Sequence, residues 1–357
     1  MGLLRTLGRV SLAMALGLAL AAAPSPALAD TVLYLAHAQK QDDPYALMPV
    51  MAATFQRELA RASNGALRVE IFPNGWLGGN RDTVGLVNDN VVQTAIVTAG
   101  GISGVYPQIA VPEIPFAFDS AAVAEAVLDG PFGRRMAGEI AGKSNLVTLG
   151  FGDSGGFYAL TNAAREIRLP QDVRQLRLRT IPGFGAMDAM IAALGATPVK
   201  VSSRDEATAL ASGVVDGQMN TVSYVLASRY DEVQKYVTLA SFMYAPLVWV
   251  INKQTLAALS PEQRAMVTAA AEAGIAAGRQ ATRALDQSDR GLPALRKRMS
   301  VHLATAEERT AFKAAMQPAA KDYIARTFGA EGSGLVDTLF QGIAEAERHQ
   351  GGAKARP

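Results

Sequence analysis

The sequence contains no cysteine, and its 357 residues include only three histidines. Without thiols the chain has no disulfide, no thiolate metal site and no cysteine nucleophile. None of the histidines (His37, His302 and His349) is paired with another at the spacing of zinc ligands. We therefore expect no bound metal, no cofactor and no cysteine-based catalysis.

A concentrated basic surface is also missing. Lysines and arginines are scattered among acidic residues, and no basic stripe is interleaved with the aromatic residues, which make up 6% of the chain. This distribution argues against nucleic acid as a partner. After Asp30 no uninterrupted apolar run is long enough to span a bilayer. We expect no direct membrane insertion of the mature chain.

Residues 1–29 have the pattern of a cleaved export signal. Arg5 and Arg9 precede an apolar run over 10–22, and Ala27-Leu28-Ala29 supplies the small residues that signal peptidase requires. A membrane anchor would need a longer apolar core. We predict cleavage near Ala29 and a periplasmic mature protein. Loss of the two arginines changes the formal charge from +2 to 0, so the basic precursor pI indicates no anionic partner.

The mature chain, about 330 residues, exceeds the size at which one core usually stops growing, so two lobes are expected. Short apolar runs alternate with amphipathic helical stretches, which is typical of an α/β fold. The segment 100–101 reads as a loose glycine stretch. Strands are predicted at 32–36, 67–72, 94–97, 146–149, 157–160, 176–181 and 247–251, and helices at 44–61, 82–87, 184–194 and 204–211.

Two capping boxes mark the start of late helices. Ser260 and Gln263 flank Pro261 in the first box, and Thr305 and Glu308 form the second. The first helix extends past residue 285, which makes it long enough to brace two lobes.

The segment Gly152-Asp153-Ser154-Gly155-Gly156 matches the residues around the nucleophile of chymotrypsin-like proteases. Such an enzyme also needs a base, an orienting acid and two β-barrels to hold them. The chain lacks regularly spaced short strands, and its last part is helical. We interpret these five small residues as a turn between two strands and expect no catalytic residues; a secreted serine hydrolase using Ser154 remains the alternative.

Arg177 and Arg179 lie two residues apart in a predicted strand, so their side chains share a face. A strand covered on both sides makes a buried arginine costly unless it has a partner. Arg179 is nearer the carboxyl end, where α/β proteins bind ligands, and a guanidinium suits bidentate pairing with a carboxylate. An edge strand with two solvated arginines is the other open interpretation.

A second polar segment follows Val214 and Val215, which lead into a predicted strand near Met219 that enters a turn. Gln218 and Asn220 share one side of this strand, where their amides could orient a carboxylate or a hydroxyl. A simple polar turn would also explain them.

Ordered segments along the chain resemble the solute-binding proteins of tripartite ATP-independent periplasmic (TRAP) transporters, the DctP-like family. The resemblance extends from about Val32 to Phe328. The segments that carry it are Leu35-Ala36-His37, Phe72-Pro73-Asn74-Gly75, Leu77-Gly78-Gly79, Ile114-Pro115-Phe116, Leu160-Thr161-Asn162, Leu178-Arg179-Thr180-Ile181-Pro182, Leu194-Gly195-Ala196-Thr197-Pro198, Val215-Asp216-Gly217-Gln218 with Asn220, and Tyr230-Asp231-Glu232-Val233-Gln234-Lys235-Tyr236.

The resemblance implies an α/β, two-lobed clamshell with crossing strands and a long bracing helix. We expect one lobe from 30–156 plus 245–284 and the other from 157–244 plus 285–350. The small polar residues of 351–357 predict a disordered tail.

The resemblance also implies a non-catalytic receptor that captures a small organic acid for TRAP membrane subunits. In the family, the arginine matching Arg179 pairs with the ligand carboxylate, and the asparagine matching Asn220 supports it. The remaining ligand-binding residues expected by position are Thr98, Tyr158, Phe184, Asp205, Tyr224 and Phe242.

Two departures from the family pattern bear on the ligand. Tyr158 stands where many relatives have a second arginine, and Phe242 replaces a frequent histidine. One fewer cation and two aromatic walls favour a monocarboxylate with an apolar, aromatic or hydroxylated body. A sensor-linked receptor with the same fold is a further alternative.

Overall fold

The structure is a computed structural model that describes residues 31–354. The predicted signal segment 1–29 lies outside the described residues. No helix in the described part of the chain is both long and apolar enough to cross a bilayer.

One sheet of ten strands organises the described residues, in the order β2-β1-β3-β9-β4-β7-β5-β6, with β8 joining β4 to β10. Six of the seven predicted strands lie within observed ones, two of them (146–149 and 157–160) in the single strand β4, and the prediction 176–181 extends one residue beyond β5 at each end. The strands are β1 (Thr31–His37), β2 (Leu67–Phe72), β3 (Thr94–Thr98), β4 (Leu146–Asn162), β5 (Arg177–Thr180), β6 (Thr197–Lys200), β7 (Gly217–Thr221), β8 (Tyr236–Leu239), β9 (Tyr244–Asn252) and β10 (Ser300–Leu303).

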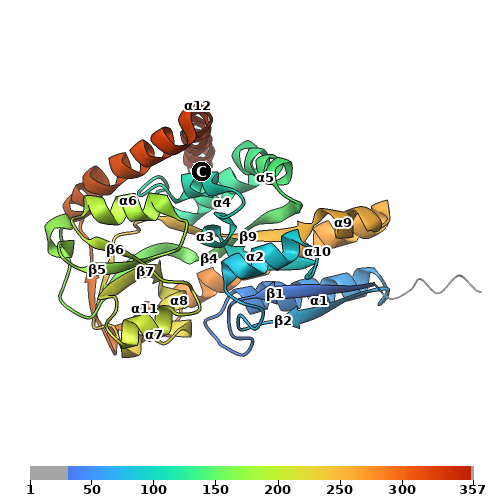
Figure 1. Ribbon diagram of the computed structural model, residues 1–357, viewed down its shortest axis with the longest axis horizontal. Coiled ribbons are helices and arrows are strands. Elements are labelled where there is room, and N and C mark those ends of the chain that lie inside the picture. The colour runs from blue at the N-terminus through green and yellow to red at the C-terminus, as the bar shows by residue number, and fades with distance from the viewer. Residues whose placement is uncertain (1–30, 355–357) are drawn as a thin grey trace, which may run out of the picture.

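Helices cover both faces of this sheet, as Figure 1 shows. They are α1 (Met48–Ala62), α2 (Asn80–Asn88), α3 (Ala99–Ile102), α4 (Ala121–Asp129), α5 (Pro131–Lys143), α6 (Gly185–Ala193), α7 (Glu206–Ala211), α8 (Val222–Ala227), α9 (Lys253–Ala258), α10 (Pro261–Asp286), α11 (Leu292–Arg296) and α12 (Ala306–Lys354), with short 3-10 helices η1 (Pro107–Glu113), η2 (Pro170–Val173) and η3 (Tyr230–Glu232).

The molecule has two halves that share strand β4. We call β1, β2, β3 and their helices the first half, and β5, β6, β7 and their helices the second half. β4 pairs with β9 as far as Phe157, and with β7 and β8 beyond it (Figure 1). This arrangement confirms the two-lobed α/β fold. The expected lobe boundaries at 156/157 and 244/245 stay a prediction.

Strand β9 shows why the sheet centre is buried. All nine of its residues, Tyr244–Asn252, are buried. A near-continuous apolar run is what a strand covered by helices on both faces requires. Trp249 packs against Phe55 of α1 with ring centroids 5.1 Å apart, and its indole N–H donates to Thr94 Oγ1 at 3.0 Å.

Both predicted capping boxes are confirmed. Ser260 Oγ accepts from the Gln263 backbone N–H at 3.2 Å, and Gln263 Oε1 accepts from the Ser260 N–H at 2.9 Å. Thr305 and Glu308 exchange the equivalent two bonds at the start of α12.

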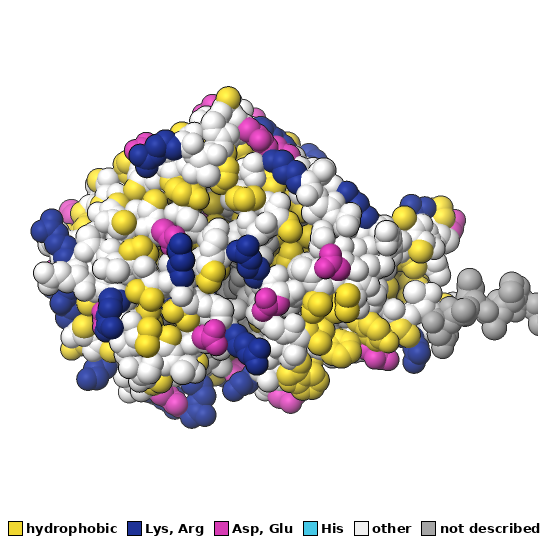
Figure 2. Space-filling view, in the orientation of Figure 1, with side chains coloured by type: hydrophobic (Ala, Val, Ile, Leu, Met, Phe, Trp, Pro, Cys, Tyr) yellow, Lys and Arg dark blue, Asp and Glu magenta, His cyan; other side chains and the backbone are white. Residues whose placement is uncertain are grey.

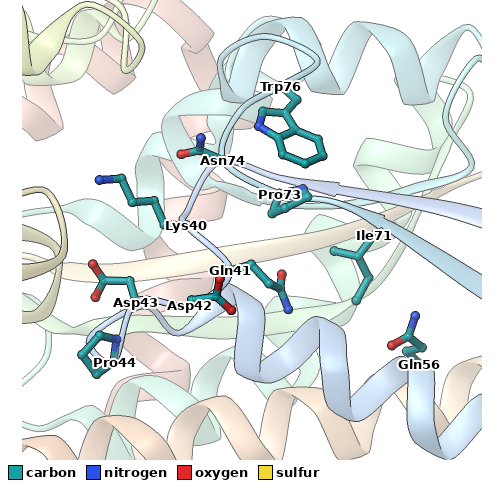
Figure 3. Close-up of a pocket in the computed structure, with 10 residues that line it drawn as sticks. All are labelled: Lys40, Gln41, Asp42, Asp43, Pro44, Gln56, Ile71, Pro73, Asn74 and Trp76. Carbon is teal, nitrogen blue, oxygen red and sulfur yellow. The ribbon is translucent and has the colours of Figure 1, made fainter.

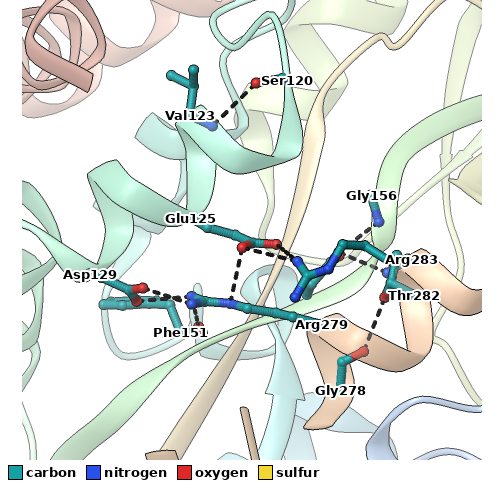
Figure 4. Close-up of polar contacts among 12 residues, drawn as sticks. Ser120, Val123, Glu125, Asp129, Phe151, Gly156, Gly278, Arg279, Thr282 and Arg283 are labelled. Atoms are coloured by element: carbon teal, nitrogen blue, oxygen red, sulfur yellow. Dashed lines mark hydrogen bonds and ion pairs between the residues drawn. The ribbon is translucent and has the colours of Figure 1, made fainter. Parts of the chain in front are cut away.

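The helix predicted after Ser260 is α10. It packs on α1 and on β4, the strand that the two halves share. Arg279 fixes it there, because its guanidinium donates to both carboxylate oxygens of Asp129 at 2.7 and 2.9 Å and to the Phe151 carbonyl at 2.9 Å (Figure 4). The long helix in contact with both halves is α12, which packs on α6 and on η1, α4 and α5. The sequence pattern predicted the length of α10 but not the elements on which it packs.

The last helix, α12, reaches into the segment predicted as a tail. α12 bends at Gly329 (φ 58°, ψ −140°) and continues to Lys354. Part of 351–357 is thus helical, since an existing helix gains one backbone hydrogen bond for each residue it adds.

The Gly152–Gly156 segment is not a turn between two strands. It lies inside β4, and the pairing of β4 with β9 shifts register between Asp153 and Phe157. Gly155 and Gly156 have φ of 107° and 80°, and Asp153 Oδ1 accepts from both of their N–H groups, at 2.9 and 2.6 Å. Glycines with positive φ let the strand bulge without ending.

Helix α1 begins at Met48, not at Pro44. Gln39 Oε1 accepts from the N–H groups of Leu47 and Met48 at 2.9 and 2.8 Å. A side chain eight residues upstream therefore satisfies the donors at the helix start. The glycines at 100–101 are not loose either, because they form part of the short helix α3.

Candidate ligand-binding site

A cavity of about 230 Å³ lies where the carboxyl ends of β3, β5 and β7 meet helices α2 and α7. This is where open α/β sheets place ligands. In Figure 2 the surface is hollowed between the two halves near α2, with basic side chains beside the hollow. The cavity is lined by Gly79, Asn80, Arg81, Asp82, Thr98, Gly101, Tyr158, Arg179, Ile181, Pro182, Met187, Ser202, Ser203, Glu206, Met219, Asn220 and Tyr224.

Five of the eight predicted ligand-binding residues line this cavity. They come from both halves and from segments far apart in sequence, and they are Thr98, Tyr158, Arg179, Asn220 and Tyr224.

The other three predicted residues do not line the cavity. Phe242 is fully buried in the core, with its ring centroid 5.8 Å from that of Phe116 and 5.0 Å from that of Phe312. Phe184 is 1% exposed and packs in the same core. Asp205 stands at the exposed N-cap position of α7, where its carboxylate makes no capping bond but accepts from Ser202 Oγ at 2.6 Å. The structure does not place Phe242, the expected aromatic wall, in the lining of this cavity, because its ring packs against Phe116 and Phe312 in the core.

Arg179 is the buried cation of the cavity. It is 4% exposed, its Nε donates to the Val201 carbonyl at 3.0 Å, and Nη1 lies 3.4 Å from Glu206 Oε2. Arg177, two residues earlier, is exposed and forms an ion pair with Asp216 at 2.6 Å. The two arginines thus have different roles. Arg177 fixes the strand at the surface, while Arg179 presents charge inside.

Glu206 is a cavity residue that the sequence analysis missed. Burial raises the pKa of its carboxyl, and this shift is opposed by Arg179 and by hydrogen bonds from Tyr230 and Asn220. The Asn220 amide donates to Glu206 Oε1 at 3.0 Å and to Gln218 Oε1 at 2.6 Å. A helix-start glutamate next to Asp205 carries no sequence signal that separates it from a surface residue.

A second buried carboxyl group lies behind Tyr158. The Tyr158 hydroxyl donates to Glu113 Oε1 at 3.3 Å, and Glu113 is 1% exposed. Burial raises the pKa of Glu113 to about 8, against the hydrogen bond from Tyr158. Burial likewise raises the pKa of the Tyr224 hydroxyl to about 12. This side of the cavity therefore presents neutral hydroxyl groups.

The cavity mouth is made of residues that the sequence analysis did not select. Asn80 and Arg81 begin α2 in the first half, and Ser202 and Ser203 precede α7 in the second half. Asn80 is 6% exposed, and its Oδ1 has no hydrogen-bond partner among the described residues. Ordinary surface residue types at a helix start gave no indication of this placement.

A larger groove, of about 730 Å³, lies on the surface of the first half (Figure 3). Its lining contains none of the predicted ligand-binding residues. It includes Lys40, Asp42 and Trp76, whose side chain is 68% exposed. Solvated charges attract an anion far less than the buried guanidinium of Arg179 does.

Comparison with known proteins shows the family. The model of the bacterial extracellular solute-binding proteins, family 7 (DctP), matches residues 35–327. This chain belongs to that family. The resemblance noted from the sequence is therefore confirmed.

Two curated DctP-family relatives differ in how much of the chain they match. A solute-binding protein from Verminephrobacter eiseniae is 31% identical over 61% of this chain and 64% of its own length, so the match spans less than two thirds of that relative. The C4-dicarboxylate-binding periplasmic protein DctP of Rhodobacter capsulatus is 28% identical over 86% of this chain and 90% of its own length.

Solved DctP-family structures share the fold. The sugar-acid-binding protein DctPAm of Advenella mimigardefordensis, in complex with galactonate, is 26% identical with a TM-score of 0.80, covering 88% of this chain and 99% of that one. A TRAP periplasmic solute-binding protein from Bordetella bronchispeptica, with density interpreted as pantoate, is 28% identical with a TM-score of 0.79, covering 87% of this chain and 98% of that one.

Members of the DctP family are substrate-binding proteins rather than enzymes, and the surroundings of Ser154 give the hydrolase alternative no support. The Ser154 carbonyl accepts from Thr221 Oγ1 at 2.7 Å and from Ser223 Oγ at 3.2 Å. His302 is paired with Glu308 at 2.6 Å, and His37 is buried on β1. Within residues 31–354, no group of three or more His, Asp or Glu side chains is placed to hold a metal ion.

Proposed function

We propose that this chain is an exported, periplasmic solute-binding protein that captures a small monocarboxylate with a hydroxylated body and delivers it to ion-gradient-driven TRAP membrane subunits. The observation that carries this proposal is the buried Arg179 guanidinium in the cavity wall. A charge-assisted hydrogen bond from a guanidinium to a carboxylate stabilises a complex by about 1.5–3 kcal/mol.

The remaining lining supports a ligand body that is partly polar and partly apolar. Neutral hydrogen-bonding groups come from Asn80, Ser202 and Ser203, while Met187 and Met219 offer apolar surface. The cavity, at about 230 Å³, is smaller than those that hold drug-sized ligands. A short carbon chain with hydroxyl groups fits both properties.

The charge balance favours one carboxylate over two. Tyr158 supplies no positive charge, because a phenol is neutral, and the carboxyl group of Glu113 behind it, with a pKa raised to about 8, supplies none either. Arg81, at the mouth, donates to the Pro182 carbonyl. Pantoate and galactonate, named with two of the related structures, each carry one carboxylate and several hydroxyl groups. The DctP protein of Rhodobacter capsulatus, named for C4-dicarboxylates, represents the competing ligand class.

The test is titration calorimetry with pantoate, galactonate and succinate on the wild type and on Arg179→Ala. We expect one of the hydroxylated monocarboxylates to bind, and we expect Arg179→Ala to weaken that binding at least about tenfold, which corresponds to 1.4 kcal/mol. Arg177→Ala is the matched control, since it removes an exposed arginine from the same strand.

Two results would contradict the proposal. Unchanged affinity in a folded Arg179→Ala variant would exclude Arg179 as the carboxylate anchor. Tighter binding of a dicarboxylate than of its monoacid analogue, such as galactarate over galactonate, would exclude the monocarboxylate assignment.

A further inference from the structure

Arg81 connects the two halves of the molecule across the mouth of the cavity. It is the second residue of α2, in the first half, and its Nη1 donates to the carbonyl of Pro182 at 3.1 Å. Pro182 follows β5, in the second half. Both residues line the cavity. This bond can form only when α2 and the turn after β5 lie against each other.

The Arg81 guanidinium occupies a slot between two glycines. A Cβ added to Gly183 would lie 2.3 Å from Nη1, and one added to Gly104 would lie 3.2 Å from Cζ. Gly183 also has φ of +84°, which disfavours other residues. Gly104 follows α3 in the first half, while Gly183 belongs to the second. The slot therefore forms only when the two halves lie together, because each half contributes a glycine, which has no side chain, to one wall.

Two further pairs of residues show that the halves also lie close together elsewhere around the mouth. A Cβ added to Gly100 of α3 would lie 2.4 Å from Ile181 Cδ1, and one added to Gly79 would lie 3.1 Å from Ser203 Oγ. Ile181 and Ser203 belong to the second half. Arg81 is the charged side chain among these contacts, and its bond to a carbonyl is directional.

We propose that Arg81 is a latch that holds the two halves closed over the ligand and so sets how long a bound acid stays. The proposal rests on the proposed function and adds to it a residue that acts on release. An interaction made only in the closed form shifts the population toward that form, and a bound ligand leaves only after the interaction breaks. Removing one charge-assisted bond corresponds to about a tenfold change in that equilibrium.

The first experiment measures dissociation by stopped flow, with pantoate and galactonate as probes. Arg81→Ala should release whichever probe the wild type binds at least about tenfold faster, with a smaller change in the association rate. Arg81→Lys should fall between the two, because an ammonium group can donate one bond but does not fill a planar slot. Arg204→Ala is the control, since Arg204 is an exposed arginine just before α7 and does not line the cavity.

The second experiment needs no ligand. The chain has no cysteine, so Val91→Cys and Val214→Cys, at exposed positions in the two halves, accept a pair of spin labels without background. Pulsed electron resonance then gives the distance distribution between the halves. Arg81→Ala should shift it toward longer distances relative to the same labelled protein with Arg81 intact.

The outcomes of these experiments test the latch proposal independently of the proposed function. Unchanged dissociation rates or an unchanged label distribution in Arg81→Ala would overturn the latch. An effect of Arg81→Ala on the distribution, together with failure of Arg179→Ala to weaken binding, would support the latch and refute the anchoring role of Arg179. A loss of melting temperature in ligand-free Arg81→Ala, with no change in the label distances, would mark Arg81 as merely structural.

Discussion

At the residue scale, Glu113 is a carboxyl group placed where its charged form is costly. It is 1% exposed, and its Oε2 has no hydrogen-bond partner in the described residues. Burial therefore raises its pKa from an ordinary value of 4.5 to about 8. Between pH 4.5 and about pH 8, the Glu113 carboxyl holds a proton in the folded protein, whereas the unfolded chain releases it. The contribution of Glu113 to stability is then complete below about pH 4.5 and is lost as the pH rises toward 8.

We predict that Glu113→Gln is more stable than the wild type at pH 8.5, by up to roughly 5 kcal/mol, and close to it at pH 4.5. Glutamine keeps an acceptor for the Tyr158 hydroxyl and cannot ionise. Urea denaturation at the two pH values measures the difference. Glu70→Gln, at an exposed strand position, is the control substitution, and an equal effect of Glu113→Gln at both pH values would refute the assignment.

At the element scale, strand β4 remains one strand because Asp153 organises its bulge. The side chain is 1% exposed, and its Oδ1 accepts from two consecutive glycine N–H groups. The register shift lies where β4 leaves β9 and passes into the second half. The bulge thus directs the strand across the molecule while its backbone donors stay satisfied.

Asp153→Ala should lower the free energy of unfolding by about 2–4 kcal/mol, because it leaves one buried and one partly buried N–H group without an acceptor. Asp153→Asn should cost less, since the amide oxygen can accept the same two bonds. Chemical denaturation of both variants measures the contrast. If asparagine is as harmful as alanine, the backbone bonds are not what Asp153 contributes.

At the scale of the whole molecule, the two halves are joined by a shared strand, a shared helix and a shared core. They share β4, and α12 packs on both. One apolar core contains Val97 from the first half, Leu178 from the second and Phe312 from α12. The shared core therefore joins the two halves in addition to the contacts across the cavity mouth.

We predict that calorimetry of the ligand-free protein shows one unfolding transition, because the apolar core described above extends through both halves and α12, although each half also has a smaller cluster of its own. Leu339→Ala, a fully buried position in the second part of α12, should lower stability by about 2–5 kcal/mol. The variant should move the whole transition to lower temperature. Two separable transitions in either protein would show that the halves unfold independently.

The sequence by itself determined the features that depend on neighbouring residues. The capping box at Ser260 and Gln263 fixed the start of α10, because its bonds join residues three apart. The apolar run in β9 determined a strand buried on both faces. The position of Arg179 near a strand end indicated a cavity residue, and the resemblance to the DctP family strengthened that prediction.

Only the tertiary structure decided which distant residues meet. Gln39 caps α1, Glu206 pairs with Arg179, and Arg81 reaches the second half. It also placed Phe242 in the core and packed α12 on elements of both halves. The physical reason is the same in each case. Local periodicity fixes an element and its buried face, whereas the partner on that face depends on how the sheet brings separate segments together.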